Sequence, residues 1–167
     1  MASLLLFLRA TGTEIYNSPS ALTIEPPATE RSAEDSLIVP GTRIGPVTLG
    51  LAKEQFTGSL GLGKMRPHED GVIHLYEDQG LAIYTQSERV VSVTVRSPNF
   101  RTRGGVGVGV DVNTVLQNLG KDYELVGDEN NYALHNWQQG WHVGIEDNTV
   151  VYFQITTMVD SPPVEKS

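Results

Sequence analysis

Val47-Thr-Leu-Gly-Leu-Ala-Lys-Glu-Gln-Phe-Thr-Gly-Ser-Leu-Gly61 is matched, 59 positions further along the chain, by Val106-Gly-Val-Gly-Val-Asp-Val-Asn-Thr-Val-Leu-Gln-Asn-Leu-Gly120. In each copy a short apolar segment reaches a glycine, and a helix-length segment then ends in Leu-Gly. Later segments match as well: Gly80-Leu-Ala-Ile83 with Gly140-Trp-His-Val143, and Val90-Val-Ser-Val-Thr-Val95 with Val150-Val-Tyr-Phe-Gln-Ile155. Repeats of this length usually correspond to paired supersecondary units. A duplicated scaffold favours an extended surface over a single catalytic cleft.

Each copy predicts the element order β-α-β-β-β. In the first copy we expect a strand at 43–49, a helix at 52–60 and strands at 72–76, 81–86 and 90–96. In the second copy we expect a strand at 106–110, a helix at 112–119 and strands at 131–135, 140–146 and 150–156. Gly61 is the expected stop of the first helix, Asp111 the N-cap of the second, and Asp147-Asn148 a hairpin turn. The predicted fold class is therefore α+β, with two tandem β-α-β-β-β repeats forming one largely antiparallel sheet with helices on one face.

Composition divides the chain into four segments. Residues 17–35 are rich in Ser, Pro, Thr and Glu, and we predict that 1–36 form a disordered N-terminal segment or tether. Repeat 1 covers 37–99, repeat 2 covers 100–159, and 160–167 form a disordered tail. The run Leu4-Leu-Leu-Phe-Leu8 is too short to span a membrane, and its flanks do not make a convincing signal peptide.

Charge and cysteine content exclude several functions. The net charge is −8 and the pI is about 4.9, which argues against partners such as nucleic acid or anionic membranes. These values fit a soluble protein or one that meets a basic partner. The sequence has no cysteine, so thiol catalysis, zinc–thiolate sites and disulfides are excluded.

Spacing between the copies predicts the strand register. Leu60 and Leu119 differ by 59 positions, as do Leu75 and Leu134, whereas Gly80 and Gly140 differ by 60. This places one inserted residue in a hairpin near Asn136-Trp137 of the second copy. Alternation then assigns to the helix-covered side Ile73, Leu75, Leu81, Ile83, Val91, Val93, Val95, Tyr132, Leu134, Trp141, Val143, Ile145, Val151, Phe153 and Ile155.

The opposite, open side of the predicted sheet is unusual for a surface that faces water. It is expected to carry His74, Tyr76, Ala82, Tyr84, Gln86, Ser92, Thr94, Ala133, His135, His142, Gly144, Glu146, Tyr152 and Gln154. Tyrosine is enriched at recognition surfaces because it offers a large contact area with a polar group. The alternative is that aromatic residues simply favour strands and pair across them.

A family resemblance rests on Val47-Thr-Leu-Gly-Leu-Ala-Lys-Glu-Gln-Phe and its counterpart Val108-Gly-Val-Asp-Val-Asn-Thr-Val-Leu. The pattern is an apolar strand, Gly, an apolar residue, Thr or Ser, a polar pair and then Val. It resembles the β-lactamase inhibitor protein family and the small outer-membrane assembly lipoproteins that share its fold, over about three quarters of the chain. The chain departs from the family at Ala52 and Asp111, which replace the usual Thr or Ser. It also lacks the disulfide that each inhibitor repeat carries.

The resemblance implies a bacterial, secreted or lipoprotein-derived protein with an inhibitor-like or assembly-accessory role, in an extracytoplasmic location. In the inhibitors, the aromatic open face of an eight-stranded sheet grips a target enzyme, and a hairpin of the first repeat inserts an acidic residue. The matching hairpin here is Glu77-Asp-Gln-Gly80, which singles out Asp78.

Catalytic motifs are weak. Gly104-Gly-Val-Gly-Val-Gly109 lacks the Lys-Ser/Thr of a phosphate-binding loop, and no G-x-S-x-G occurs. His74, His135 and His142 could share the open side, but they have no metal-ligand spacing and no carboxylate partner. We therefore expect no catalytic residue, no cofactor and no metal.

The sequence thus predicts a non-enzymatic protein-binding module with a protein partner, no nucleic acid and no direct membrane span. The expected partner-binding residues are Tyr76, Asp78, Tyr84, Trp137, His142 and Tyr152. Trp141 is expected to be buried and Trp137 exposed at a hairpin tip. The alternative function is a small-ligand or metal-dependent enzyme that uses the open-side histidines. A weaker alternative is a purely structural accessory subunit.

Overall fold

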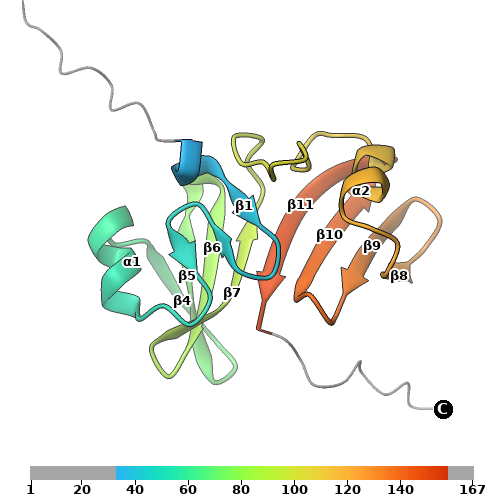
Figure 1. Ribbon diagram of the computed structural model, residues 1–167. Coiled ribbons are helices and arrows are strands. Elements are labelled where there is room, and N and C mark those ends of the chain that lie inside the picture. The colour runs from blue at the N-terminus through green and yellow to red at the C-terminus, as the bar shows by residue number, and fades with distance from the viewer. Residues whose placement is uncertain (1–32, 158–167) are drawn as a thin grey trace, which may run out of the picture. The chain divides into compact units, whose positions relative to one another are not determined.

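A computed structural model describes residues 33–157, and its main element is an eight-stranded sheet in which all neighbouring strands are antiparallel (Figure 1). The strand order is β4-β5-β6-β7-β11-β10-β9-β8. The bounds are β4 (Lys64–His68), β5 (Gly71–Tyr76), β6 (Leu81–Gln86), β7 (Arg89–Val95), β8 (Glu124–Gly127), β9 (Asn131–Asn136), β10 (Trp141–Glu146) and β11 (Thr149–Thr156). The predicted α+β class with a largely antiparallel sheet is confirmed.

A second, small sheet precedes the large one. It joins β1 (Ile38–Val39), β2 (Arg43–Ile44) and β3 (Val47–Thr48), with Ile38, Ile44 and Val47 buried. The strand predicted at 43–49 is therefore two short strands. Gly45, with a φ of 55°, and Pro46 turn the chain between them, and proline offers no N–H to a strand ladder.

Most of the predicted N-terminal tether, residues 1–32, lies outside the described residues. The predicted tail at 160–167 lies wholly outside them. The last residues of the tether do have regular structure, because Ala33–Ser36 form the 3₁₀ helix η3. The Arg101 N–H donates to the Ser36 carbonyl at 3.1 Å, and the Ile38 N–H donates to the Arg101 carbonyl at 2.8 Å. The folded part thus begins before residue 37, where we predicted the boundary.

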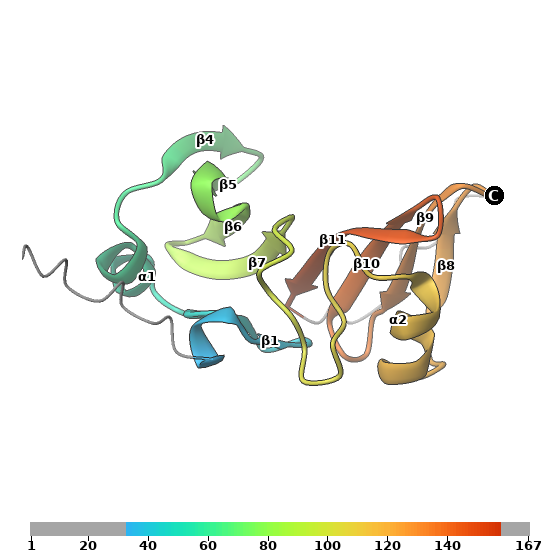
Figure 2. The same cartoon turned by 90° about the horizontal axis from the view of Figure 1, so that it is seen from above.

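The two helices begin and end where local signals predicted. α1 (Lys53–Leu60) ends at Gly61, which has a φ of 80° and donates its N–H to the Thr57 carbonyl. α2 (Val112–Asn118) follows Asp111, whose carboxylate accepts the Asn113 N–H at 2.8 Å. Figure 2 shows α1 beside the strands that follow it and α2 beside β8 to β11. Phe56 of α1 and Val112 and Val115 of α2 belong to one buried cluster with the sheet.

The same backbone hydrogen bonds recur around both helices, at offsets of 59 or 60 positions. Gly50 donates to Val90 and Gly109 to Val150, both at 2.8 Å; Lys53 donates to Glu88 and Val112 to Asn148, both at 2.9 Å. Ala52 and Asp111, which precede the helices, share the dihedrals φ −70° and ψ 146°. The segments 47–61 and 106–120 therefore hold their helices against the following hairpins in the same way.

The predicted strands differ from the observed strands at three places. The strand predicted at 106–110 is absent, because this segment turns repeatedly, with φ values of 84° at Gly105 and 90° at Gly109. In contrast, β4 and β8 were not predicted. Every residue in both strands is exposed, so neither strand shows the alternation of a half-buried strand.

The one-residue difference in spacing between the two halves lies between α2 and β8 and not in the hairpin near Asn136-Trp137, where we predicted it. The β5–β6 and β9–β10 loops have equal length, because Tyr76 pairs with Leu81 and Asn136 with Trp141. His74 pairs with Ile83 where Leu134 pairs with Val143, so His74 is the counterpart of Leu134. A shift of one residue moves a strand's side chains to the other face. The face assignment of β5 was therefore wrong.

On β5, His74 and Tyr76 are only 2% and 7% exposed and lie on the helix-covered side. The His74 ring packs against Phe56 of α1, with ring centroids 5.2 Å apart, and its Nε2 lies 3.2 Å from the Thr85 hydroxyl. Ile73 and Leu75 lie on the open side, because they pair with Tyr84 and Ala82.

Two β-bulges explain why Val91 and Val151 do not lie on the helix-covered side, where we predicted them. The register shifts after Tyr84 on β6 and after Gly144 on β10, which leaves Val91 and Val151 as extra residues. Both extra valines line hollows on the open side, while Val90 and Val150 are buried in their place. A bulge inserts one residue and so interrupts simple alternation.

Candidate recognition face

The open face is the side of the eight-stranded sheet opposite the helices, and its second half carries a continuous row of rings. Adjacent ring centroids are 4.8 Å apart for Trp137 and His135, 4.4 Å for His135 and His142, and 5.5 Å for His142 and Tyr152. The Arg96 guanidinium lies 5.2 Å from the Tyr152 centroid at the end of this row. We call these five residues the aromatic row.

Strand pairing explains how the row assembles. His135 of β9 stands directly opposite His142 of β10, and Tyr152 of β11 stands opposite Gly144 of β10. A Cβ atom placed on Gly144 would lie 2.0 Å from Cε1 of Tyr152, so the tyrosine ring lies against bare backbone. The absence of a side chain at 144 therefore sets the position of Tyr152 beside His142.

Both imidazoles of the row are neutral near pH 7. Burial, and next the neighbouring His135, lower the pKa of His142 to about 4, although a hydrogen bond from His142 to Gln154 opposes the change. Burial also lowers the pKa of His135, against the effect of Glu124. The Nδ1 atom of His135 is buried without a hydrogen-bond partner within residues 33–157. The four rings of the row are thus uncharged near pH 7, and Arg96 supplies the single positive charge at its end.

Polar contacts fix the Trp137 end of the row and the strands beside its other end. The Trp137 indole N–H donates to the Glu124 carboxylate at 3.0 Å, and the Gln154 amide donates to the Ser92 hydroxyl at 2.6 Å. Ser92 belongs to β7, so the second contact crosses the junction between β7 and β11. Burial raises the pKa of Tyr152, and the charge of Arg96 opposes this change. These contacts hold the rings in defined orientations.

The open face also contains two shallow hollows. One, of about 420 Å³, lies beside Tyr152 and His135 over the small residues Ala133 and Gly144, with Glu146 at its border. The other, of about 380 Å³, lies around Tyr84 over Ala82 and Ser92.

Tyr84 belongs to a hydrogen-bonded cluster rather than to a stack of rings. Its hydroxyl donates to Asp70 at 3.0 Å, and Gln86 donates to the same carboxylate oxygen at 2.6 Å. The Gln86 bond is the main reason that the pKa of Asp70 is lowered, with Tyr84 contributing next. The His68 ring meets Tyr84 edge to face at 5.6 Å. The open face of the first half is therefore polar and charged at this point.

The predicted binding residues fall into two groups. Tyr84, Trp137, His142 and Tyr152 lie on the open face, with Trp137 partly exposed. Tyr76 does not, and its assignment to that face is corrected for the register reason given above. Trp141 is buried at 2% exposure, as predicted.

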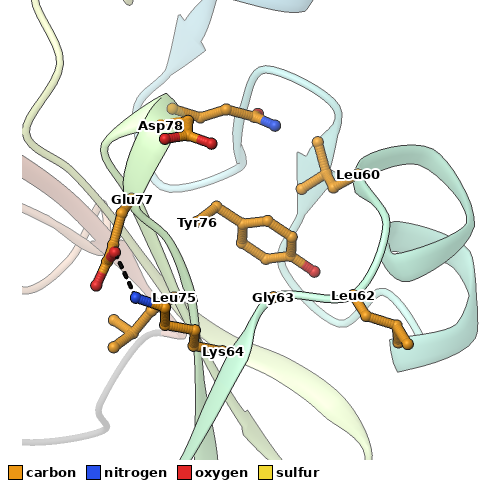
Figure 3. Close-up of a pocket in the computed structure, with 9 residues that line it drawn as sticks. Leu60, Leu62, Gly63, Lys64, Leu75, Tyr76, Glu77 and Asp78 are labelled. Atoms are coloured by element: carbon orange, nitrogen blue, oxygen red, sulfur yellow. Dashed lines mark hydrogen bonds and ion pairs between the residues drawn. The ribbon is translucent and has the colours of Figure 1, made fainter.

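Tyr76 and Asp78 line a separate hollow of about 260 Å³ between the end of α1 and the β5–β6 hairpin. Figure 3 shows the Tyr76 ring directed toward Leu60 and Gly63, and its hydroxyl donates to the Gly61 carbonyl at 2.9 Å. Asp78 lies in the hairpin, in the 3₁₀ helix η4 (Glu77–Gln79), beside an ion pair of 2.7 Å between Glu77 and Lys64.

Sequence reasoning did not select His135 and Arg96 as site residues. The period of two had placed His135 on the correct face, and its pairing with His142 was the available signal. The hypothesis that three histidines share the open face is wrong, because His74 lies in the core. Within the described part of the chain, no group of three or more His, Cys, Asp or Glu side chains could hold a metal ion. Of the helices in residues 33–157, none combines the length and apolar character that a membrane crossing requires.

Comparison with known proteins gives no family. The sequence matches no protein-family model and no curated protein. An extracellular Bacillus anthracis protein containing an SCP domain shares 10% identity over 65% of this chain and 43% of its own, with a TM-score of 0.47. An uncharacterized Escherichia coli protein shares 12% identity over 71% of this chain and 98% of its own, also with a TM-score of 0.47.

A cysteine-rich secretory protein of Staphylococcus aureus shares 11% identity over 71% of this chain and 47% of its own, with a TM-score of 0.48. This chain thus spans less than half the length of the Bacillus and Staphylococcus proteins. At TM-scores below 0.5, neither a fold family nor a function is assigned from these similarities.

Proposed function

We propose that this chain is a non-enzymatic protein-binding module that presents the open face of its sheet to a protein partner. The aromatic row is the observation that carries the proposal. One face of the sheet is covered by helices, and the uncovered face of such a sheet is expected to be plainly polar. Here that face holds two neutral imidazoles, an indole, a phenol and a guanidinium in one continuous row of tilted and edge-to-face contacts.

The row has the composition and rigidity of a binding surface. Tryptophan, tyrosine and arginine are the residues that most often dominate the energy of protein interfaces. Because these side chains already pack on one another, they lose little rotamer freedom when a partner covers them. The hollow over Ala133 and Gly144 offers room for a partner's side chain next to the row.

We further propose that the two halves of the sheet are tandem repeats. The recurring hydrogen bonds around α1 and α2 support this. Two such repeats would fit the resemblance to the β-lactamase inhibitor family, which supports an inhibitor-like or assembly-accessory role in an extracytoplasmic location. Asp78 would then act at a partner's pocket from the β5–β6 hairpin.

A second candidate is a small-ligand or metal-dependent activity at the histidine pair. The unpartnered Nδ1 of His135, stacked on His142, is the observation that favours it. Titration with Zn²⁺, followed through the imidazole carbon resonances, tests this candidate. Shifts confined to His135 and His142 and saturating at micromolar metal would support it over the binding module.

The binding proposal is tested by photo-crosslinking from defined positions of the full chain. A photoreactive amino acid replaces Thr94 on the open face, and a matched control replaces Gln117 on α2. We expect a discrete crosslinked partner from position 94 in lysate of the source organism and none from position 117. The variant Tyr152→Ala should reduce the yield at unchanged far-UV circular dichroism. Equal crosslinking from both positions would contradict the proposal.

A further inference from the structure

The two outer strands of the sheet differ in how they are protected. β4 carries Lys64, Arg66 and Pro67, and natural proteins use lysine and proline to prevent edge strands from pairing with other chains. β8 carries neither residue type. Its adjacent Leu125 and Val126 are 59% and 51% exposed. β8 is thus the unprotected edge of this sheet.

Backbone geometry identifies the free groups of β8. The Asp128 N–H donates to the Asn131 carbonyl at 3.0 Å and closes the turn between β8 and β9. Bonded and non-bonded pairs alternate along an antiparallel ladder. Glu124 and Val126 therefore bond toward β9, whereas Leu125 and Gly127 direct their N–H and C=O groups away from it. No strand of residues 33–157 lies on that side of β8.

The chemistry around this edge is acidic. Asp122, Glu124, Asp128 and Glu129 are exposed within eight positions, with Lys121 as the neighbouring cation. Glu124 also accepts the Trp137 indole N–H, which connects the edge to the aromatic row. Val126 lines the hollow beside Tyr152, so the edge and the hollow are continuous.

We propose that β8 accepts an extended segment of the partner protein as a ninth strand, and that this segment carries lysine or arginine at alternate positions. The inference rests on the proposed function, because it names the way in which the partner is held. Main-chain hydrogen bonds to Leu125 and Gly127 would align the segment, as in other cases of strand addition. One row of its side chains would face the carboxylates, and a residue opposite Val126 would lie beside the hollow bordered by Glu146.

The test uses the full chain and an acetylated, amidated peptide of about seven alternating lysine and valine residues, a common strand length. On saturation, amide hydrogen exchange at Leu125 and Gly127 should slow by about tenfold or more, as expected for newly bonded amides. Exchange at Glu124 and Val126, already bonded to β9, should change little. A peptide with glutamate in place of lysine should have no effect.

Two reagents separate strand addition from simple charge attraction. A peptide N-methylated at alternate backbone nitrogens keeps its charge and loses the N–H donors along the edge that would pair with β8. It should therefore bind about tenfold more weakly. Leu125→Pro removes an outward N–H and should lose a similar factor, whereas Leu125→Ala retains that group and should lose much less. Equal binding of the N-methylated peptide, or of the proline variant, would overturn the inference.

If Leu125→Pro does not fold, the pair Asp122→Asn and Glu129→Gln provides the test, because both side chains are exposed. This double variant should bind more weakly and with a smaller salt dependence; unchanged binding would contradict the inference. Protection of Leu125 that grows with protein concentration in the absence of peptide would show a second copy as the occupant and overturn it. Crosslinking from Thr94 at an undiminished yield in Leu125→Pro would leave the proposed function standing and refute only the strand addition.

Discussion

The first half of the large sheet (β4 to β7) and the second half (β8 to β11) have equivalent backbone hydrogen bonds to their helical segments, but different side chains on their open faces. On β6 and β7 the pair is Tyr84 with Ser92, whereas on β10 and β11 the corresponding pair is Gly144 with Tyr152. The tyrosine ring thus belongs to the first strand of the pair in the first half and to the second strand of the pair in the second half. In the second half it meets His142, and in the first half it meets Asp70 and Gln86. Similar backbone pairing in the two halves is thus compatible with different chemistry on their open faces.

The helix-covered face differs as well. His74 of β5 stands where β9 has Leu134, and Leu81 of β6 stands where β10 has Trp141. Both members of each pair are buried. The second half therefore has the larger apolar side chains at these positions, and the first half has a hydrogen-bonded imidazole.

The largest expected effect follows from this difference in the core. Trp141→Ala should lower the free energy of unfolding by about 3–5 kcal/mol, because it empties a fully packed site. Leu81→Ala, its counterpart, should cost less, about 2–4 kcal/mol. Urea denaturation of both variants measures the difference. A larger loss for Leu81→Ala would show that the first half holds the dominant core.

Acid should destabilise the second half through His142. Its pKa is about 4 in the folded chain, whereas the ordinary value, which applies to the unfolded chain, is 6.5. Between these pH values the unfolded state therefore binds a proton that the folded state excludes. The free energy of unfolding should fall as the pH decreases, by about 2 kcal/mol from pH 7 to pH 5. His135 and His74, whose pKa values are also lowered, act in the same direction.

The control for this pH dependence is His142→Gln, measured by urea denaturation at both pH values. The variant should flatten the curve, because the glutamine does not titrate beside His135 and Tyr152. A slope identical to that of the parent chain would mean that other groups cause the acid sensitivity.

Gly144→Ala should displace Tyr152, because the new Cβ would lie 2.0 Å from Cε1 of that ring. Crowding of this kind typically costs about 1–3 kcal/mol. Adding Tyr152→Ser reproduces the small residue that β7 has opposite Tyr84, and it should restore part of the loss. A double-mutant cycle by thermal denaturation measures the coupling. Additive losses would show that Tyr152 does not depend on Gly144.

The smallest effect is expected for His74→Leu, which gives β5 the residue found at the equivalent position of β9. The leucine keeps the contact with Phe56 and loses the bond to Thr85, whose hydroxyl retains the Val72 carbonyl at 3.3 Å. The change in stability at pH 7 should be within about 1 kcal/mol. Isothermal chemical denaturation checks this value. A loss of several kcal/mol would indicate that the imidazole organises the first half.

Local signals predicted much of the fold. Gly61, Asp111 and the Asp147-Asn148 turn act through backbone preferences that a short sequence window contains. The outer strands β4 and β8 could not be predicted in this way, because their side chains are exposed on both faces. Their position depends on pairing with β5 and β9, which no residue pattern within them indicates.

The predicted register of β5 was wrong for a different reason. Leu75 and Leu134 are the same residue type, and matching them placed the inserted residue in the wrong connection. Only the contacts of His74 with Phe56 and Thr85, distant in sequence, explain why an imidazole is buried there. The bulges at Val91 and Val151 likewise depend on cross-strand pairing. The open-face residues Tyr84, His142 and Tyr152 could be predicted, because they lie where simple alternation holds.

The central position of β11 has a consequence for synthesis of the chain. β11 is the last strand of residues 33–157 but pairs with β7 in the middle of the sheet, joining residues as distant as Val95 and Phe153. While a ribosome is still translating the second half, β7 has an unpaired edge beside the apolar Val93 and Val95. Pairing between distant segments slows folding. The nascent first half must therefore avoid association with other chains until the strand that completes it has been made.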